Sequence, residues 1–183
     1  FGIGKYPTSL MIPAREGHLP HESQFTLRDK VSSCYGYGIT LSALQIAQAY
    51  SVFANDGNFI ELNLFKDQYV GEIHKHRAIG SETNRLIVDM LVETVNSSNG
   101  TASKARLKDF EVAGKTGTAK ETLDEISSYT STFAGFVPSD NPEYLAVIVL
   151  SGLTGEDYSG GRVSAPVFSN IMKQIFLMKD LEI

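Results

Sequence analysis

The sequence predicts an α+β fold, in which helices pack on an antiparallel sheet. Three strand-like segments, residues 110–119, 129–137 and 144–151, follow one another closely, and short connections favour antiparallel pairing over parallel crossovers. Segments whose apolar residues recur at helical spacing precede and follow these strands in the chain. With 183 residues the chain is long enough for a sizeable core, and it contains no internal repeat or interdomain linker.

The composition is that of an ordinary soluble globular protein, with 42% hydrophobic and 20% charged residues. A net charge of −5 without a Lys/Arg-rich run argues against a general nucleic-acid binder, so no nucleic acid is predicted as a partner. The longest apolar run, residues 145–150, has the length of a strand and is too short for a transmembrane helix. The chain begins at Phe1 without a methionine or a signal peptide, and we expect it to be a fragment.

The cysteine and the histidines predict neither a metal site nor a cofactor. Cys34 is the single cysteine, which excludes an intrachain disulfide, and we predict a lone buried thiol. Two histidines, His74 and His76, are spaced to share one face of a strand. The four histidines do not follow a zinc-binding pattern, and we interpret them as solvated surface residues: His18, His21, His74 and His76.

The first third of the chain predicts irregular structure followed by one helix. Residues 1–35 lack periodicity and contain three prolines, so we expect loops with one short helical turn near residues 22–27. A helix follows, with Thr40 as its N-cap and Asn55-Asp56-Gly57 as its stop signal. Its apolar residues have the spacing of one buried face: Ala43, Ile46, Ala47, Tyr50, Phe53 and Ala54.

The middle of the chain predicts two short strands and a second helix. The strands are residues 60–65 and 68–73, and the helix begins at Ser81 and ends in the turn-forming residues 96–100. A further short helix is predicted over residues 101–108. The second helix is expected to bury one set of apolar residues: Leu86, Ile87, Met90, Leu91 and Val95.

The last part of the chain predicts the remaining two strands and a final helix. The first two strands are joined by a polar, acidic link over residues 120–128, and residues 138–142 form a turn. A glycine-rich loop over residues 152–162 leads to a helix that Ser164 caps and that has Pro166 near its start. The apolar stripe of this helix is expected to be core: Val167, Phe168, Ile171, Met172, Ile175 and Phe176.

One strand carries the residues with the clearest chemical meaning, Lys115-Thr116-Gly117-Thr118. Because strand side chains alternate, Lys115 and Thr116 should lie on opposite faces, and Gly117 marks a place where a ligand can come close. A cation, hydroxyls and exposed backbone N–H groups suit an anionic ligand that bears a carbonyl. The alternative interpretation is a solvated hairpin strand that contains Lys-Thr-Gly by chance.

Three further stretches accompany this strand, and together the four resemble the penicillin-binding proteins, the peptidoglycan D,D-transpeptidases that share a fold with serine β-lactamases. They are Gly36-Tyr37-Gly38-Ile39-Thr40 running into the first helix and its stop signal, Gly100-Thr101-Ala102, and Tyr158-Ser159-Gly160-Gly161 with Ser164-Ala165-Pro166-Val167-Phe168. The sequences of the first helix and of the C-terminal stretch around residues 158–168 are most similar to those of the class B enzymes of cell division or elongation, especially the septal one. By this resemblance the fold would be part of the penicillin-binding-protein/serine β-lactamase-like transpeptidase fold.

The resemblance implies a role for each residue of the strand. Lys115 would be a cation that supports the proton network around the nucleophile and the substrate carboxylate, and Gly117 would let the substrate backbone approach. Thr116 and Thr118 would donate hydrogen bonds to the terminal carboxylate of a D-Ala-D-Ala stem peptide or of a β-lactam. The backbone N–H of Thr118 would form half of an oxyanion hole. The loop residues Tyr158, Gly160 and Gly161 would border the cleft.

The sequence departs from the family pattern at the nucleophile. The family's nucleophilic serine lies in Ser-x-x-Lys, and no serine here has a lysine three residues later. Ser97-Ser98-Asn99 matches the second motif, Ser-x-Asn, but it follows the second helix, and we interpret it as a helix-ending turn. We therefore expect residues 1–183 to be the C-terminal portion of one transpeptidase domain. The nucleophile, its lysine and the second motif would then precede Phe1.

The resemblance also implies a setting for the parent protein: the periplasmic face of the bacterial inner membrane, with cell-division or elongation proteins as candidate partners. Two alternatives stay open. One is a non-catalytic transpeptidase-like scaffold that has lost its nucleophile. The other is a fragment of a D,D-carboxypeptidase or a serine β-lactamase, which fits the Gly-Tyr-Gly segment and the C-terminal tail less well.

Overall fold

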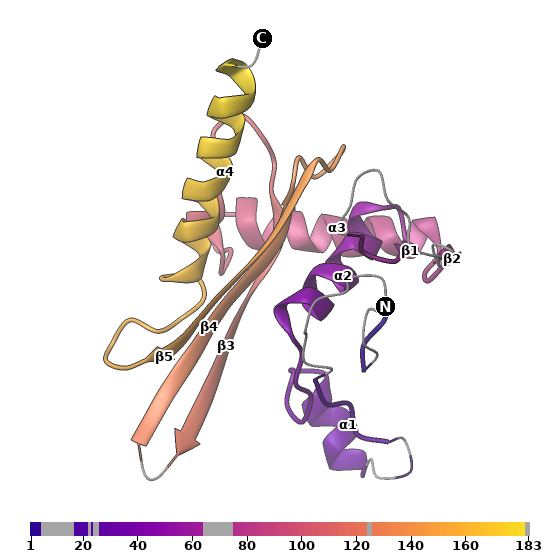
Figure 1. The fold of residues 1–183 in the computed structure, drawn as a ribbon, viewed down its shortest axis with the longest axis vertical. Coiled ribbons are helices and arrows are strands. Elements are labelled where there is room, and N and C mark those ends of the chain that lie inside the picture. Colours follow the sequence, from indigo (N-terminus) through magenta and orange to yellow (C-terminus); the bar gives the residue numbers. More distant parts are fainter. Residues whose placement is uncertain (5–16, 22, 24–25, 64–74, 124–125, 182–183) are drawn as a thin grey trace.

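The structure is a computed structural model that describes residues 1–4, 17–21, 23, 26–63, 75–123 and 126–181. Figure 1 shows an antiparallel sheet with the C-terminal helix along one side, the first two helices on the other, and the helix of residues 81–96 crossing from one side to the other. This arrangement confirms the α+β prediction. The elements are α1 (Leu27–Ser33), α2 (Ala43–Ala54), β1 (Asn58–Ile60), β2 (Lys75–Arg77), α3 (Ser81–Asn96), a 3₁₀ turn (Ser103–Ala105), β3 (Ala113–Leu123), β4 (Ile126–Val137), β5 (Tyr144–Leu153) and α4 (Ser164–Leu181).

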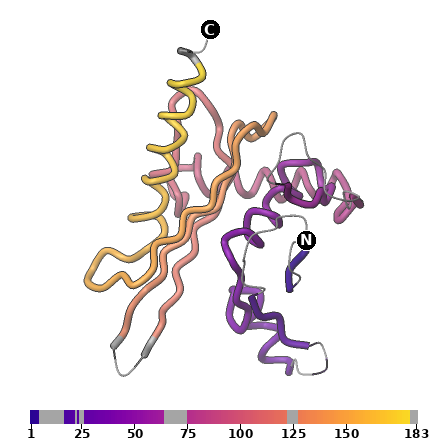
Figure 2. The backbone as a smooth tube through the Cα atoms, in the orientation of Figure 1, coloured from indigo at the N-terminus to yellow at the C-terminus, as the bar shows by residue number. Residues whose placement is uncertain are grey.

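The main sheet has the strand order β3-β4-β5, and both pairs are antiparallel. This confirms the predicted meander, which the smooth backbone trace also shows (Figure 2). The predicted link over residues 120–128 is wrong in extent, because β3 continues to Leu123 and β4 already begins at Ile126. The polar residues there pair across the hairpin, with the Thr130 hydroxyl donating to the Glu121 carboxylate over 2.8 Å. This polar stretch forms strand because the partner strand satisfies its backbone, whatever its own strand propensity.

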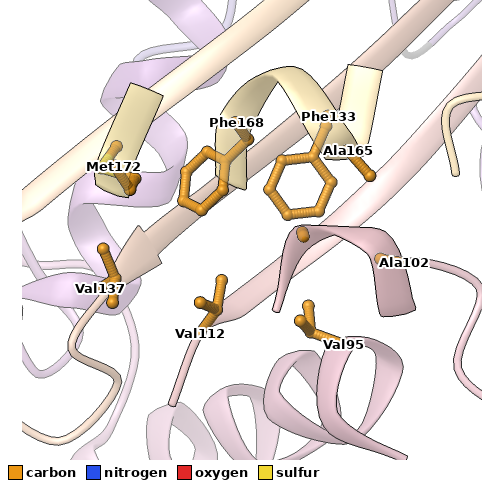
Figure 3. Packing of buried hydrophobic residues seen from close by; sticks show 9 residues of the cluster. Val95, Ala102, Val112, Phe133, Val137, Ala165, Phe168 and Met172 are labelled. Atoms are coloured by element: carbon orange, nitrogen blue, oxygen red, sulfur yellow. The ribbon is translucent and has the colours of Figure 1, made fainter. Parts of the chain in front are cut away.

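Among the described residues, two clusters of buried apolar side chains pack on the main sheet, one on each face. Phe133 and Phe136 are fully buried and point to opposite faces, because they are three residues apart on β4. Phe133 packs against Phe168 of α4 with ring centroids 4.7 Å apart, inside the larger cluster that Figure 3 shows. Phe136 belongs to a smaller cluster that α2 and α3 cover. The larger cluster comprises Val95, Ala102, Ala105, Val112, Phe133, Val137, Ala165, Phe168 and Met172.

The caps of the first two helices differ from the sequence prediction. Helix α2 begins two residues later than expected, because Ser42 and Gln45 form a capping box and Ser42 is the N-cap. Thr40 instead pairs with His18 through two backbone hydrogen bonds of 2.8 and 3.0 Å. The helical turn expected near residues 22–27 lies partly outside the described residues. The observed helix α1 starts at Leu27, after a capping box of Thr26 and Asp29.

Several residues expected in the interior are exposed. In α3 the buried positions 84, 91 and 95 form one line along the helix, so Leu86 and Met90 face away and are 52% and 65% exposed. Ile171 of α4 and Ala43 of α2 are also exposed. The prediction of a buried Cys34 is wrong, because the residue lies at the end of α1, a helix without buried residues.

The short elements of the middle region also differ from expectation. Only residues 103–105 of the predicted helix over 101–108 are helical, as a 3₁₀ turn. The predicted strand at residues 60–65 overlaps the observed β1 only at Ile60, and the one at 68–73 lies outside the described residues. β1 pairs with β2, where the His76 ring stacks on Phe59 at 4.8 Å. Within the described ranges, no helix combines the length and apolarity needed to cross a bilayer.

Burial of Tyr50 on α2 predicts a loss of stability at alkaline pH. Burial raises the pKa of the Tyr50 hydroxyl to about 12 from an ordinary value of 10.0. Between these values the unfolded chain loses a proton that the folded chain retains, so the free energy of unfolding falls as the pH rises, by about 2 to 3 kcal/mol in all. We expect Tyr50→Phe to remove this part of the decline in urea unfolding between pH 9 and about 12.

Tyr35→Phe is the matched control, because the Tyr35 side chain is 77% exposed. This control should leave the alkaline decline unchanged. Parallel curves for Tyr50→Phe and the unsubstituted protein over the same pH range would contradict the prediction.

Candidate functional site

Three stretches that are far apart in the sequence meet at β3. The Thr116 hydroxyl donates to the Thr101 hydroxyl over 3.3 Å, which connects β3 to Gly100-Thr101-Ala102. The backbone N–H of Gly160 donates to the Thr118 hydroxyl over 3.1 Å, which connects β3 to the loop before α4. The stretches noted in the sequence are therefore neighbours at one strand.

Lys115 and Thr116 lie on opposite faces of the sheet, as the alternation predicts. Thr116 is opposite Phe133 and shares the face that α4 covers, whereas Lys115 is opposite Ala134 on the other face. The two side chains nevertheless meet, because Lys115 Nζ donates to the Thr116 carbonyl oxygen over 3.0 Å and lies 3.4 Å from its hydroxyl. The ammonium group thus lies at the edge of the strand, and Lys115 is exposed.

Every second residue of β3 directs its backbone N–H and C=O groups away from β4. β3 is an edge strand of the described sheet, and we call the side away from β4 the open edge. The carbonyl oxygens of Gly114 and Thr116 accept bonds there, from Thr94 and from Lys115 Nζ respectively. A strand residue directs its N–H and C=O to the same side, and the side alternates along the chain. The N–H of Thr118, two residues further on, therefore also points to the open edge.

Helix α3 occupies the first part of this edge. The Thr94 hydroxyl donates to the Gly114 carbonyl, and the Asn96 side-chain amide donates to the Val112 carbonyl over 2.9 Å. From the sequence, Asn96 was expected only as a turn-forming residue at the end of the helix, and Thr94 had no predicted role. Their one signal was a polar residue in the last turns of an otherwise amphipathic helix. The part of the edge beyond α3 begins at Thr116.

The glycines of the site serve different purposes. Gly160 is buried, and a Cβ there would lie 2.6 Å from the Thr132 carbonyl oxygen and 2.7 Å from that of Gly117, so only glycine lets the loop pack on β3. At Gly117 a Cβ would make an ordinary contact of 3.6 Å with Thr132. Gly117 is exposed, and internal packing does not require a glycine there. Its bare backbone is available to a ligand.

The loop before α4 is fixed by an aromatic contact. Tyr158 stacks on Tyr129 of β4 with ring centroids 3.7 Å apart and an interplanar angle of 11°. Gly161, which the sequence also singled out, follows Gly160 and packs against the Thr101 carbonyl. The sequence predicted Tyr158 beside the site but gave no signal for its partner Tyr129.

The fourth stretch of the resemblance behaves differently. Gly36 and Gly38 have positive φ angles of 86° and 76°, and a Cβ at either would meet nothing within 4 Å among the described residues. The segment leads from α1 into α2, and α2 packs on β4 and β5. The helix side of this stretch supports the sheet, while its exposed glycines stay unassigned.

The serine-containing patterns lie in turns. Ser97-Ser98-Asn99 directly follows α3 with Ser97 as the C-cap, as predicted. The Ser-x-Asn pattern also occurs at Ser139-Asp140-Asn141, in the turn between β4 and β5, where the Ser139 N–H donates to the Glu111 carbonyl. A groove of about 540 Å³ lies near this turn, between the end of α2 and the start of α3. None of Lys115, Thr116, Thr118 and Gly160 lines it.

Comparison with known proteins points to one family. The family model described as "Penicillin binding protein transpeptidase domain" matches residues 1–173. The probable peptidoglycan D,D-transpeptidase PbpC of Pseudomonas aeruginosa is 35% identical over 170 residues, which cover 91% of this chain and 30% of that protein. The peptidoglycan D,D-transpeptidase FtsI of Buchnera aphidicola (subsp. Schizaphis graminum) is 33% identical over 187 residues, which cover 100% of this chain and 32% of that protein.

A solved structure agrees in fold. The apo structure of the TP domain of Burkholderia pseudomallei penicillin-binding protein 3 matches with a TM-score of 0.84 and 30% identity, over 97% of this chain and 54% of that one. The chain spans about a third of the length of the curated relatives it matches.

Proposed function

The chain belongs to the penicillin-binding protein transpeptidase domain family, in its class B, and on this premise we propose that it is the C-terminal portion of a serine-type peptidoglycan D,D-transpeptidase domain. It supplies the wall that holds the substrate carboxylate and half of the oxyanion hole. The observation that carries this proposal is the arrangement of residues 115–118 on β3, where an ammonium group and an outward N–H at the open edge and two hydroxyls on the adjoining face lie within four consecutive residues.

The reaction that this wall serves is acyl transfer through serine. A serine attacks the penultimate D-Ala carbonyl of a stem peptide and D-Ala leaves, after which an amine of a neighbouring stem peptide takes the acyl group. A β-lactam acylates the same serine. The attacking serine, its lysine and the true Ser-x-Asn motif are provided by the preceding part of the domain, because this sequence has no Ser-x-x-Lys.

Each residue of the wall has a role in this reaction. Lys115 at the open edge attracts the carboxylate and supports the proton network of the serine, and the Thr118 hydroxyl donates a hydrogen bond to that carboxylate. The Thr116 hydroxyl donates to it as well, after its proton turns away from the Thr101 hydroxyl that it contacts in the ligand-free chain. The outward N–H of Thr118 stabilises the oxyanion of the tetrahedral intermediate. Gly117 leaves room for the substrate backbone, and the loop with Tyr158, Gly160 and Gly161 borders the site.

The setting of the complete protein belongs to the same proposal. A transpeptidase acts on peptidoglycan, so we place it at the periplasmic face of the bacterial inner membrane, with an anchor outside this chain. Cell-division or elongation proteins are its candidate partners. The names of the relatives support this, since they include FtsI and PbpC.

The test is penicillin acylation by the complete transpeptidase domain that includes these residues. We expect Lys115→Ala to slow acylation by a fluorescent penicillin roughly 10- to 100-fold, because a hydrogen bond to a charged group contributes about 1.5 to 3 kcal/mol. Lys120→Ala is the matched control, since Lys120 is an exposed lysine on the same strand. It should be acylated at the unsubstituted rate.

Two results would overturn the proposal. One is an unsubstituted domain that takes up no labelled penicillin, which would favour a scaffold. The other is a Lys115→Ala domain that is acylated as fast as Lys120→Ala.

A further inference from the structure

We propose that the Tyr129–Tyr158 stack and the Gly160 N–H act together as a positioning device for the Thr118 hydroxyl, turning its proton toward the substrate carboxylate. This inference rests on the proposed function, because it gives the Thr118 hydroxyl a carboxylate to bind. Tyr129 and Gly160 are positioning residues in it, and neither needs to touch the substrate.

The hydrogen-bond capacity of the Thr118 hydroxyl restricts the directions in which its proton can point. A threonine hydroxyl has one proton to donate and two lone pairs that accept. Gly160 N–H occupies one lone pair of Thr118 Oγ1 at 3.1 Å, so the hydroxyl proton must point elsewhere. Thr118 is exposed, so the remaining directions lie on the solvent side. The bond thus removes the orientations in which the proton would turn toward the loop.

The hydrogen bond from Gly160 N–H to the Thr118 hydroxyl depends on close packing of the loop against β3. A Cβ at Gly160 would lie 3.0 Å from Thr116 Cβ and closer still to two carbonyl oxygens of β3 and β4. On the far side of the glycine, the Gly160 carbonyl accepts a bond from Ala165 N–H of α4 over 2.9 Å. The Ser131 and Ser164 hydroxyls, both buried, bond to one another over 2.5 Å and join β4 to the start of the same helix.

The stack of Tyr158 on Tyr129 holds the loop in place two residues before Gly160. Tyr158 lies two residues before Gly160, and its ring is stacked on Tyr129 at 3.7 Å. Tyr129 lies opposite Lys120, two residues beyond Thr118, so the stack sits next to the hydroxyl it serves. A stacked aromatic pair is favourable beyond the area that it buries, so the contact favours this position of the loop.

The experiment is a double-mutant cycle in the complete transpeptidase domain, with acylation by a fluorescent penicillin as the readout. We expect Tyr129→Ala to slow acylation by roughly 3- to 10-fold, the size of one net hydrogen bond, and Tyr129→Phe to restore most of the rate because it keeps the stack. In a Thr118→Val background, Tyr129→Ala should add no further loss, because the hydroxyl to be positioned is gone.

A second pair of variants covers the case in which Tyr129→Ala fails to fold. Gly160→Ala displaces the loop directly and should show the same coupling to Thr118→Val, and Tyr158→Leu removes the stack from the side of the loop. Thermal unfolding and far-UV circular dichroism identify the variants that keep the fold.

The outcomes separate this inference from the function on which it rests. If the domain is acylated and Thr118→Val slows it, but the loop variants have no effect or lose the same factor in both backgrounds, the positioning role is wrong and the proposed function stands. If the domain binds no penicillin, or if Lys115→Ala and Thr118→Val both leave the rate unchanged, the proposed function itself fails.

Discussion

Thr118→Pro should slow acylation of the complete transpeptidase domain by labelled penicillin about 10²- to 10³-fold relative to Thr118→Val, the usual loss for one oxyanion-hole donor. Both variants lack the hydroxyl, so their difference reports the backbone N–H, which proline does not have. The N–H of Thr118 points to the open edge, as the bonds at Gly114 and Thr116 establish. Its loss leaves the pairing of β3 with β4 intact, since proline is tolerated on edge strands with the N–H side outward.

Lys120→Pro is the matched control for this substitution. Lys120 has the same parity as Thr118 on β3, so its N–H also points outward, but it lies two residues further from Lys115. It should show the same small change in thermal stability and no comparable loss of acylation. Equal losses in the two proline variants would mean that strand distortion, and not the oxyanion donor, causes the effect.

Phe133→Ala should lower the free energy of unfolding by about 3 to 5 kcal/mol, because it removes a fully buried ring and leaves a cavity. The Phe133 side chain has no exposed surface and packs on Phe168. Its ring also covers the bare backbones of Gly114 and Gly135, where a Cβ would approach it within 2.9 Å. These two glycines have no side chains that could fill the space. Urea unfolding at neutral pH gives the measurement.

Phe110→Ala is the control for ring loss without full burial. Phe110 also stacks on an aromatic ring, that of Phe176 at 4.3 Å, but it is 38% exposed. It should lose clearly less stability than Phe133→Ala. Equal losses would mean that the cluster around Phe133 is no better packed than the protein surface.

Local patterns predicted the elements that have a repeated signal along the chain. Helices α2, α3 and α4 and the meander β3-β4-β5 follow from apolar spacing and turn residues. The errors occur where contact with another helix or strand determines the local structure or the burial of a residue. The polar residues after Lys120 form strand because β4 satisfies their backbone, and Leu86 is exposed because the sheet contacts a different line along α3.

In the candidate site, too, the residues of a local motif were predicted, and the contacts that other elements make with the motif were not. Lys115, Thr116 and Thr118 follow from a motif of consecutive residues, so the sequence predicted their place on one strand and their opposite faces. Thr94, Thr101 and Tyr129 contact this strand or its loop from other elements, and such contacts depend on distances that no local pattern encodes. The roles of the motif residues stay predictions until the variants above are measured.

The part of β3 beyond α3 has a consequence for solubility. A strand edge with an unpaired N–H, here proposed to bind a ligand, also offers that N–H to a strand of another molecule, and unpaired edges are where β-aggregation starts. Thr94 and Asn96 on α3 cover the edge as far as Gly114, and the exposed charges of Lys115, Lys120 and Glu121 flank what remains. Charged side chains on an edge oppose such pairing. The same lysine that is proposed to attract a carboxylate therefore also discourages the chain from extending its sheet with a second copy.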